Sequence, residues 1–151
     1  MSAGLTVRPL ATADRTGWQA LYRGYQAFYG FHHRPDGFYD AAFARLTGAD
    51  PQDFRGLLAE AGGVPVGLAH YVFHPNLWRP EGVCYLQDLF TAPAARGQGA
   101  GRALIAAVYA AADAAGVPSV YWLTAEDNYP GRMLYDRVGV KSPFIRYNRP
   151  A

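Results

Sequence analysis

The feature that most constrains the fold of this 151-residue chain is a predicted strand that leads through a glycine-rich loop directly into a helix. The strand is Val83–Thr91, a mostly apolar run that Pro93 ends, because proline cannot donate to a ladder. Glycine then occupies every second position of Arg96–Gly101, and we expect the helix from about Gly101 to Ala115. Uncovered backbone N–H groups at the positive end of a helix macrodipole form an anion site that suits phosphate.

The loop sequence alone does not identify the ligand that it would bind. The dinucleotide-binding fingerprint requires glycine at the sixth position counted from Gly97, where this chain has Arg102. Glu126 follows the next predicted strand as a ribose-binding acid would, but only about 25 residues remain after it, too few for a doubly wound domain. The phosphate loop that ends in Gly-Lys-Ser/Thr is absent. Glycines at such a junction can also serve the turn alone.

The rest of the chain predicts a single α/β domain over residues 1–151, without internal repeats or linkers. Periodicity and turn residues give the element order βααβββαβαβ. We expect strands at residues 5–10, 53–61, 64–74, 83–91, 119–124 and 144–148. The first helix is expected to begin at a cap, Thr12 or Asp14, and to end at Tyr29; the next two are expected at 38–46 and 101–115. Asp127 or Asn128 would cap a last helix that ends at Val138. The helix between the fourth and fifth strands makes these two strands parallel through a right-handed crossover.

Two further expectations concern packing and loops. The helix at 101–115 is apolar nearly all round, so we expect it to be packed on most sides. Residues 76–82, rich in glycine, proline and asparagine, predict a loop before the central strand.

Composition excludes several classes of function. The net charge of +2 and the scattered basic residues argue against a nucleic-acid or membrane-surface partner. Cys84 is the single cysteine, so there is no disulfide framework and no thiolate metal cluster, and we expect no metal site. No signal peptide is evident, and the most apolar run, Ala103–Ala112, is too short to span a membrane. These features favour a cytoplasmic protein.

The glycine loop and its surroundings resemble the GCN5-related N-acetyltransferase (GNAT) superfamily. Arg96-Gly97-Gln98-Gly99-Ala100-Gly101 matches the Arg/Gln-x-x-Gly-x-Gly/Ala pyrophosphate loop of that family. Tyr85–Thr91 looks like its central strand, and Tyr121–Thr124, Asn128 and Leu134–Asp136 look like its fifth strand and fourth helix. The matching pieces extend from about Gly67 to Tyr147 in family order and are most similar to small polyamine-type and yeast histone/polyamine-type acetyltransferases.

The resemblance implies a mixed, mostly antiparallel sheet with about four flanking helices, splayed between the fourth and fifth strands past Leu89. It implies that acetyl-CoA binds in that gap, with backbone bonds from Leu89 and Thr91. Asn128 would bond the pantetheine arm, or act as an N-cap, or do both. The cofactor residues so implied are Leu89, Phe90, Thr91, Arg96, Gly97, Gln98, Gly99, Ala100, Gly101, Arg102, Asn128 and Tyr135.

Two catalytic roles follow from the same resemblance. Tyr135 matches the general acid of the family, which protonates the departing thiolate. The Leu89 N–H, freed by a bulge in the strand, would polarise the thioester carbonyl. As an aromatic residue on an amphipathic helix, Tyr135 could equally be a core residue.

The base and the acceptor site are less determined. Gln87 stands where polyamine-type relatives have a glutamate, and an amide cannot take a proton at neutral pH. Asp88 is a possible base, amine anchor or structural residue; strand alternation puts Gln87 and Asp88 on opposite faces, so only one lines the cleft. His70 and His74 are alternative bases. Segments that wall the acceptor site in the family contain Tyr29, Phe31, His33 and Trp78, which could also be ordinary core.

We therefore expect an acetyl-CoA-dependent N-acetyltransferase that acts on a primary amine of a small molecule, such as a polyamine or amino acid, by direct attack in a ternary complex. Relatives of this kind are often dimers, so a homodimer is expected by analogy. The alternatives are a non-catalytic acyl-CoA sensor, a protein lysine acetyltransferase and, more weakly, a nucleotide-binding protein.

Overall fold

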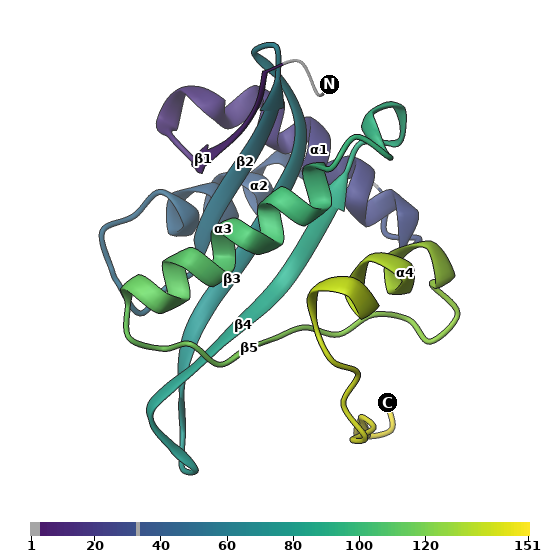
Figure 1. Cartoon of the computed structure of the whole chain (residues 1–151). Coiled ribbons are helices and arrows are strands. Elements are labelled where there is room, and N and C mark those ends of the chain that lie inside the picture. Colours follow the sequence, from purple (N-terminus) through teal and green to yellow (C-terminus); the bar gives the residue numbers. More distant parts are fainter. Residues whose placement is uncertain (1–3, 33) are drawn as a thin grey trace.

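A computed structural model describes residues 4–32 and 34–151 and confirms the α/β class. One mixed sheet has the strand order β1-β2-β3-β4-β5; the first four strands are antiparallel, and β5 is parallel to β4 (Figure 1). The strands are β1 Leu5–Pro9, β2 Arg55–Ala61, β3 Val64–Asn76, β4 Arg79–Thr91 and β5 Val120–Tyr121. The helices are α1 Arg15–Phe28, α2 Asp36–Leu46, α3 Ala100–Ala114 and α4 Tyr129–Val138, with 3-10 turns at Thr12–Asp14 and Pro93–Ala95.

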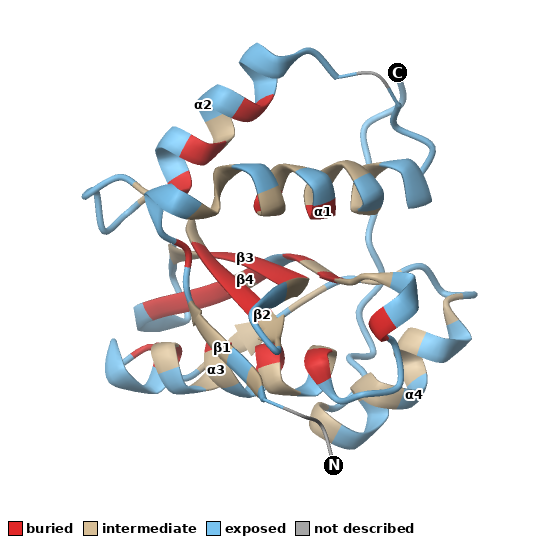
Figure 2. Ribbon diagram, turned by 90° about the horizontal axis from the view of Figure 1, so that it is seen from above, coloured by how far each residue is buried: buried red, intermediate tan, exposed pale blue. Residues whose placement is uncertain are grey.

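Helices cover both faces of the sheet. Figure 2 shows α1 and α2 on one side, and α3 and α4 on the other, with the buried residues turned toward the strands between them. Two apolar cores result: one contains Leu104, Ile105 and Val108 of α3, and the other surrounds Trp18 of α1. The predicted packing of α3 on most sides is confirmed, because most of its residues are buried or half-buried. The exposed ones are Arg102, Ala106, Ala110, Asp113 and Ala114.

β4 contains a β-bulge at Gln87. His70 of β3 pairs with Asp88, and the next residue of β3, Tyr71, pairs with Leu86, so Gln87 has no partner in the register. The extra residue shifts the alternation of side chains along β4. Leu86 and Leu89 therefore both pack in the α3 core, although they are three residues apart.

The pairing of β4 with β5 is short. Only Cys84 with Val120 and Tyr85 with Tyr121 are in register, so the two strands separate after Tyr85, four residues before the predicted position at Leu89. The predicted strand at 119–124 shrinks to two residues because Trp122 turns to pack against Tyr109 and Tyr135. A gap between the fourth and fifth strands is present, as expected, but it begins earlier.

Two other expectations about strands are wrong. Residues 76–82 do not form a loop, because β3 and β4 continue until Asn76 pairs with Arg79 around a tight turn. The final strand at 144–148 does not form, and these residues are exposed coil. β5, with two residues, offers no ladder along which another strand of the same chain could pair.

The helix ends follow local rules in most cases. Gly116 follows α3 with a φ of 73°, and Asn128 caps α4, because its side chain accepts a hydrogen bond from Gly131 N–H at 3.3 Å. Asp14 occupies the N-cap position of α1, as predicted, but its carboxylate binds Arg8 and the N–H of Ala11 instead of a helix N–H. Among the described residues, no helix is long and apolar enough to cross a membrane.

Candidate functional site

The glycine loop has the open backbone that an anion site requires. Gly97 and Gly99 have φ angles of 81° and 90°, a region that residues with a side chain rarely adopt. A Cβ on either glycine would meet no atom within 4 Å, so their backbone faces open space. Gly99 is the N-cap residue of α3 and has no side chain to satisfy the first N–H groups of the helix. These free donors at the positive helix end fit a diphosphate.

Arginine adds positive charge beside this loop. Arg96 Nε donates to the Thr91 carbonyl at 3.2 Å, and the guanidinium lies over the rings of Phe28 and Phe90. These contacts hold Arg96 at the end of β4 and leave it exposed. Arg102, in the first turn of α3, and Gln98, in the loop, are also exposed.

Helix α4 packs against the same end of α3. A Cβ on Gly101 would lie 3.2 Å from Leu134 Cδ2, so glycine at this position permits the close approach of the two helices. The adjacent residue, Tyr135, contacts Trp122 edge to face at 5.6 Å. Asn128, besides its capping bond, donates from Nδ2 to Thr124 Oγ1 at 2.9 Å. Its predicted bond to a cofactor stays a prediction.

The phenol of Tyr135 is kept protonated by its environment. Burial raises its pKa above the ordinary value, and the nearby phenol of Tyr29 adds to the effect. Tyr25 of α1 has a raised pKa for related reasons: burial first, then the charge of Asp88 and the phenols of Tyr29 and Tyr135. Side chains from α1 and α4, on opposite faces of the sheet, therefore interact electrostatically beyond the point where β4 stops pairing with β5. A protonated phenol in this position can act as a general acid.

A cavity of about 290 Å³ lies on the α1–α2 face of the bulge in β4. Its lining combines aromatic and small apolar side chains with a few polar groups. The lining residues are Tyr22, Phe38, Ala41, Ala42, Arg45, Leu46, Phe54, His70, Gln87 and Asp88. The prediction that only one of Gln87 and Asp88 lines the cleft is wrong, since the bulge turns both toward it.

Asp88 is the buried charged group of this cavity, 7% exposed. Its Oδ2 lies 2.8 Å from His70 Nδ1, and Gln87 Nε2 is 3.4 Å away. Burial, the Asp88 charge and a hydrogen bond to Asp88 raise the pKa of Tyr22. Among the described residues, no lysine or arginine forms an ion pair with Asp88.

Neither histidine proposed as a base has a ring nitrogen available. His70 is 3% exposed, and its Nε2 accepts from Trp18 Nε1–H at 2.9 Å while Nδ1 faces Asp88. His74 bonds the Pro75 carbonyl at 2.9 Å and the Tyr121 hydroxyl at 2.8 Å. It pairs with Val83, well along β4 from Asp88.

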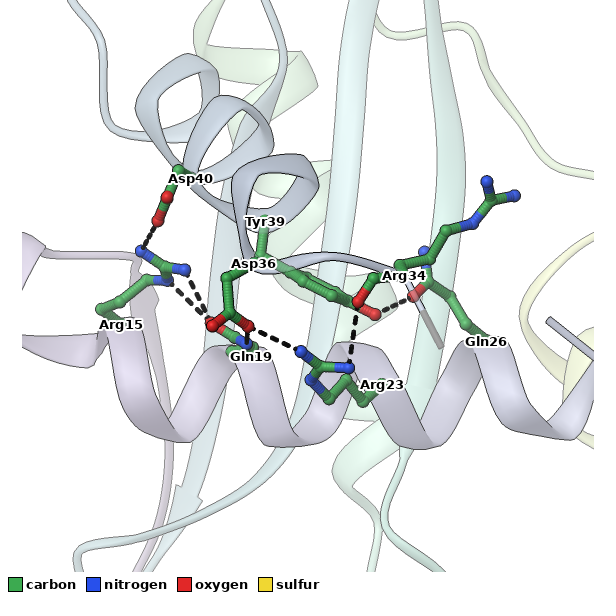
Figure 3. A network of polar contacts seen from close by, with 8 residues as sticks. All are labelled: Arg15, Gln19, Arg23, Gln26, Arg34, Asp36, Tyr39 and Asp40. Atoms are coloured by element: carbon green, nitrogen blue, oxygen red, sulfur yellow. Dashed lines mark hydrogen bonds and ion pairs between the residues drawn. The ribbon is translucent and has the colours of Figure 1, made fainter. Parts of the chain in front are cut away.

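A polar network joins α2 to α1 and so fixes the position of α2, which forms one wall of the cavity. Figure 3 shows Arg15 of α1 bound to Asp40 of α2, and Arg23 of α1 bound to Asp36 at 2.9 Å. Tyr39 donates to Gln26 within the same network. Each exposed ion pair contributes little alone, but together they determine the position of α2 over the bulge.

The structure separates the predicted acceptor residues. Tyr29 and Phe31 lie at the exposed end of α1, and His33 is outside the described residues. Trp78 does not line the cavity: it is 94% exposed in the β3–β4 turn, ten residues from Asp88 and thus about 30 Å along the strand.

Sequence reasoning missed functional candidates on α1 and α2. Trp18, Tyr22 and Tyr25 belong to an aromatic stripe at helical spacing, a pattern typical of a core-facing helix, and nothing in the sequence marks Arg45 as a site residue. The available signal was that several residues of the stripe carry an N–H or O–H group, which a buried helix face must satisfy.

Comparisons with known proteins match this geometry. Residues 18–140 match the Acetyltransferase (GNAT) family. The D-amino-acid N-acetyltransferase HPA3 of Saccharomyces cerevisiae (strain ATCC 204508 / S288c) is 33% identical over 146 residues, which are 96% of this chain and 90% of that protein.

Solved structures share the fold. AAC(6')-Iy in complex with the bisubstrate analogue CoA-S-monomethyl-acetylneamine has a TM-score of 0.81 at 21% identity, covering 99% of this chain and 100% of that one. Ribosomal-protein-alanine N-acetyltransferase from Brucella melitensis biovar Abortus 2308 has a TM-score of 0.77 at 19% identity, covering 98% and 100%. The family model matches most of the chain, and a known acetyltransferase is one-third identical along nearly all of its length. This protein therefore belongs to the GNAT family of N-acetyltransferases, whose cofactor is acetyl-CoA.

Proposed function

We propose that this enzyme acetylates the α-amino group of an amino acid, or of a similarly small zwitterionic amine, in a ternary complex with acetyl-CoA. The observation that carries the proposal is the buried carboxylate of Asp88, which forms no ion pair with a lysine or arginine of the described residues and faces a cavity of about 290 Å³. A buried charge without a counter-charge is costly, and the ammonium group of a substrate would supply one.

The cavity also contains a group for a substrate carboxylate. Arg45 lines it from α2, and Asp53 binds its Nε and Nη2 atoms at 3.0 and 2.9 Å. Among the described residues, Nη1 has no hydrogen-bond partner, so its N–H groups can donate to a second carboxylate. Asp88 is the one acidic residue of the lining, whereas a polyamine carries several cations. The name of the relative HPA3, a D-amino-acid N-acetyltransferase, supports the same class of acceptor.

The residues of the glycine loop fit the cofactor. The free N–H groups of Gly97 to Arg102 and the charge of Arg96 would hold the diphosphate, since the positive φ angles leave that backbone uncovered. When bound, acetyl-CoA supplies an acetyl group activated as a thioester. The bulge expected near Leu89 is present two residues before it, at Gln87, and the role of the Leu89 N–H as carbonyl donor stays part of the proposal.

The proton transfers are assigned to two side chains. Asp88 holds the ammonium and accepts its first proton at a carboxylate oxygen, which leaves a neutral nitrogen to form the C–N bond. Tyr135 gives its Oη proton to the sulfur as the C–S bond breaks, and the second proton of the nitrogen then restores the phenol. Asp88 returns its proton to water, so the net products are an amide, a free thiol and one released proton.

Two finer points complete the proposal. The single, buried cysteine, Cys84, whose pKa burial raises to about 11, suits a reducing cytoplasm.

Large apolar side chains of the C-terminal segment, among them Val140, Phe144 and Tyr147, are exposed, and such a patch favours a homodimer. Light scattering should give twice the mass of one chain; a monomeric mass at micromolar concentration would contradict the dimer.

The acceptor class is tested by free-thiol release with paired substrates. Amino acids with apolar side chains should be acetylated with a kcat/KM at least ~10-fold higher than their carboxamides, because the carboxamides lose the charge that Arg45 binds. Arg45→Met should reduce this discrimination to about twofold, while Arg55→Met, outside the cavity lining, should preserve it. Preference for polyamines or lysine peptides would refute the class, and acetyl-CoA binding without thiol release from any amine would favour a sensor.

The diphosphate site is tested by two substitutions at one position. Gly99→Asp should weaken CoA binding by at least ~100-fold, because it places a negative charge in the loop, whereas Gly99→Asn should cost about tenfold or less, since asparagine tolerates positive φ nearly as well. Isothermal titration calorimetry measures both. Equal losses in the two variants would show that backbone strain, and not phosphate repulsion, is responsible.

Tyr135→Phe should lower kcat by about 10²- to 10⁴-fold and leave CoA affinity unchanged, because it removes the general acid alone. Since burial raises the pKa of Tyr135 above the usual 10.0, the wild-type hydroxyl keeps its proton, and activity should not fall until the pH exceeds about 10. Tyr109→Phe makes the same chemical change where the hydroxyl donates to the Val138 carbonyl, and should change kcat by less than about threefold. Undiminished turnover in Tyr135→Phe would exclude it as the acid.

A further inference from the structure

Three side chains form a buried chain of hydrogen bonds behind the cavity. The indole N–H of Trp18, on α1, donates to His70 Nε2 at 2.9 Å, and His70 Nδ1, on β3, lies 2.8 Å from Asp88 Oδ2, on β4. Trp18 is 0% exposed and His70 is 3% exposed, so water does not compete for these bonds. Of the three, Asp88 and His70 line the cavity and Trp18 does not.

The chemistry of the donors fixes the protonation of the ring. An indole N–H can only donate, so His70 Nε2 must carry a lone pair. The single ring proton is then on Nδ1, where it donates to the Asp88 carboxylate. An imidazolium would put two N–H groups face to face at Nε2, buried and unpaired, at a large energetic cost. Trp18 therefore holds His70 as the neutral Nδ1–H tautomer.

We propose that His70 is a positioning residue: locked by Trp18 in its neutral form, it orients Asp88 and leaves the carboxylate with a full negative charge for the acceptor ammonium. This inference rests on the proposed function of the cavity. A charged His70 would neutralise Asp88 and remove the attraction for a cationic amine. A neutral donor stabilises the carboxylate and fixes its direction without cancelling its charge.

The groups that surround His70 are consistent with this role. The Tyr22 ring on α1 meets the imidazole edge to face at 4.9 Å, and its hydroxyl interacts with Asp88. On β2 the residue opposite His70 is Gly56, which has no side chain to bond either nitrogen. Among the described residues, the titratable and polar groups near the pair are thus Trp18, Tyr22 and Tyr25 of α1, Arg45 of α2 and Gln87 of β4.

The tautomer is tested directly on the wild-type enzyme. Two-dimensional NMR of ¹⁵N-labelled protein at neutral pH should show for His70 a protonated Nδ1 and an unprotonated Nε2. An Nε2–H tautomer or an imidazolium would overturn the proposal. The measurement requires neither a variant nor turnover.

The consequence for the acceptor is tested by removing the lock. Trp18→Phe frees Nε2, so His70 should take up a proton as the pH falls through the range in which histidines titrate. Relative to wild type, the KM for the acceptor should then rise at least ~10-fold more at pH 6 than at pH 8, with kcat changed less than about threefold. In Trp18→Phe/His70→Asn, which keeps a donor to Asp88 but cannot titrate, this pH difference should disappear.

The outcomes separate the two hypotheses. Trp18 and His70 would be merely structural under either of two results. One is a ratio of Trp18→Phe KM to wild-type KM that is the same at both pH values; the other is a pH difference in KM that persists in the double variant. If Trp18→Phe does not fold, the NMR result on the wild-type protein decides. A wild-type enzyme with the predicted NMR signature that acetylates no amine would overturn the proposed function alone, and an active enzyme without that signature would overturn the role of His70 alone.

Discussion

The β-bulge at Gln87 is the constraint on which the site depends. Without it, regular alternation would separate Gln87 from Asp88, and Leu86 could not share the α3 core with Leu89. With it, the strand buries apolar residues on one face and presents two consecutive polar residues to the cavity on the other. A single inserted residue therefore serves packing and chemistry together.

In the proposed reaction, the two charged substrates would meet opposite electrostatic environments. The proposed cofactor side has the N–H groups of the α3 N-terminus with Arg96, and suits a polyanion. The proposed acceptor side has the buried carboxylate of Asp88, and suits a cation. Both environments lie on β4, one at its end and one at its bulge, so the separation of β4 from β5 after Tyr85 would determine how the two substrates approach each other.

Local sequence rules predicted the parts of the site that depend on short-range physics. The glycine loop, the Asn128 cap and the helix that carries Tyr135 follow from backbone conformation and capping within a few residues. The bulge and the early end of the β4–β5 pairing depend on partners more than ten residues away, so no local pattern encodes them. Trp78 was misplaced for the same reason: the strands continue through residues 76–82, whose glycine, proline and asparagine predict a loop.

The choice of histidine beside Asp88 is explained by the competing demands on a buried carboxylate. An arginine or lysine there would stabilise the charge more strongly but would also occupy the place of the substrate ammonium. An apolar neighbour would leave the carboxylate undersolvated and favour its neutral form. A neutral imidazole donor avoids both outcomes, provided that something prevents the ring from gaining a proton. The indole of Trp18 provides that restriction because it can donate and never accept. In the proposed role, an aromatic residue that packs the core beneath α1 would therefore also set the charge of the acceptor site.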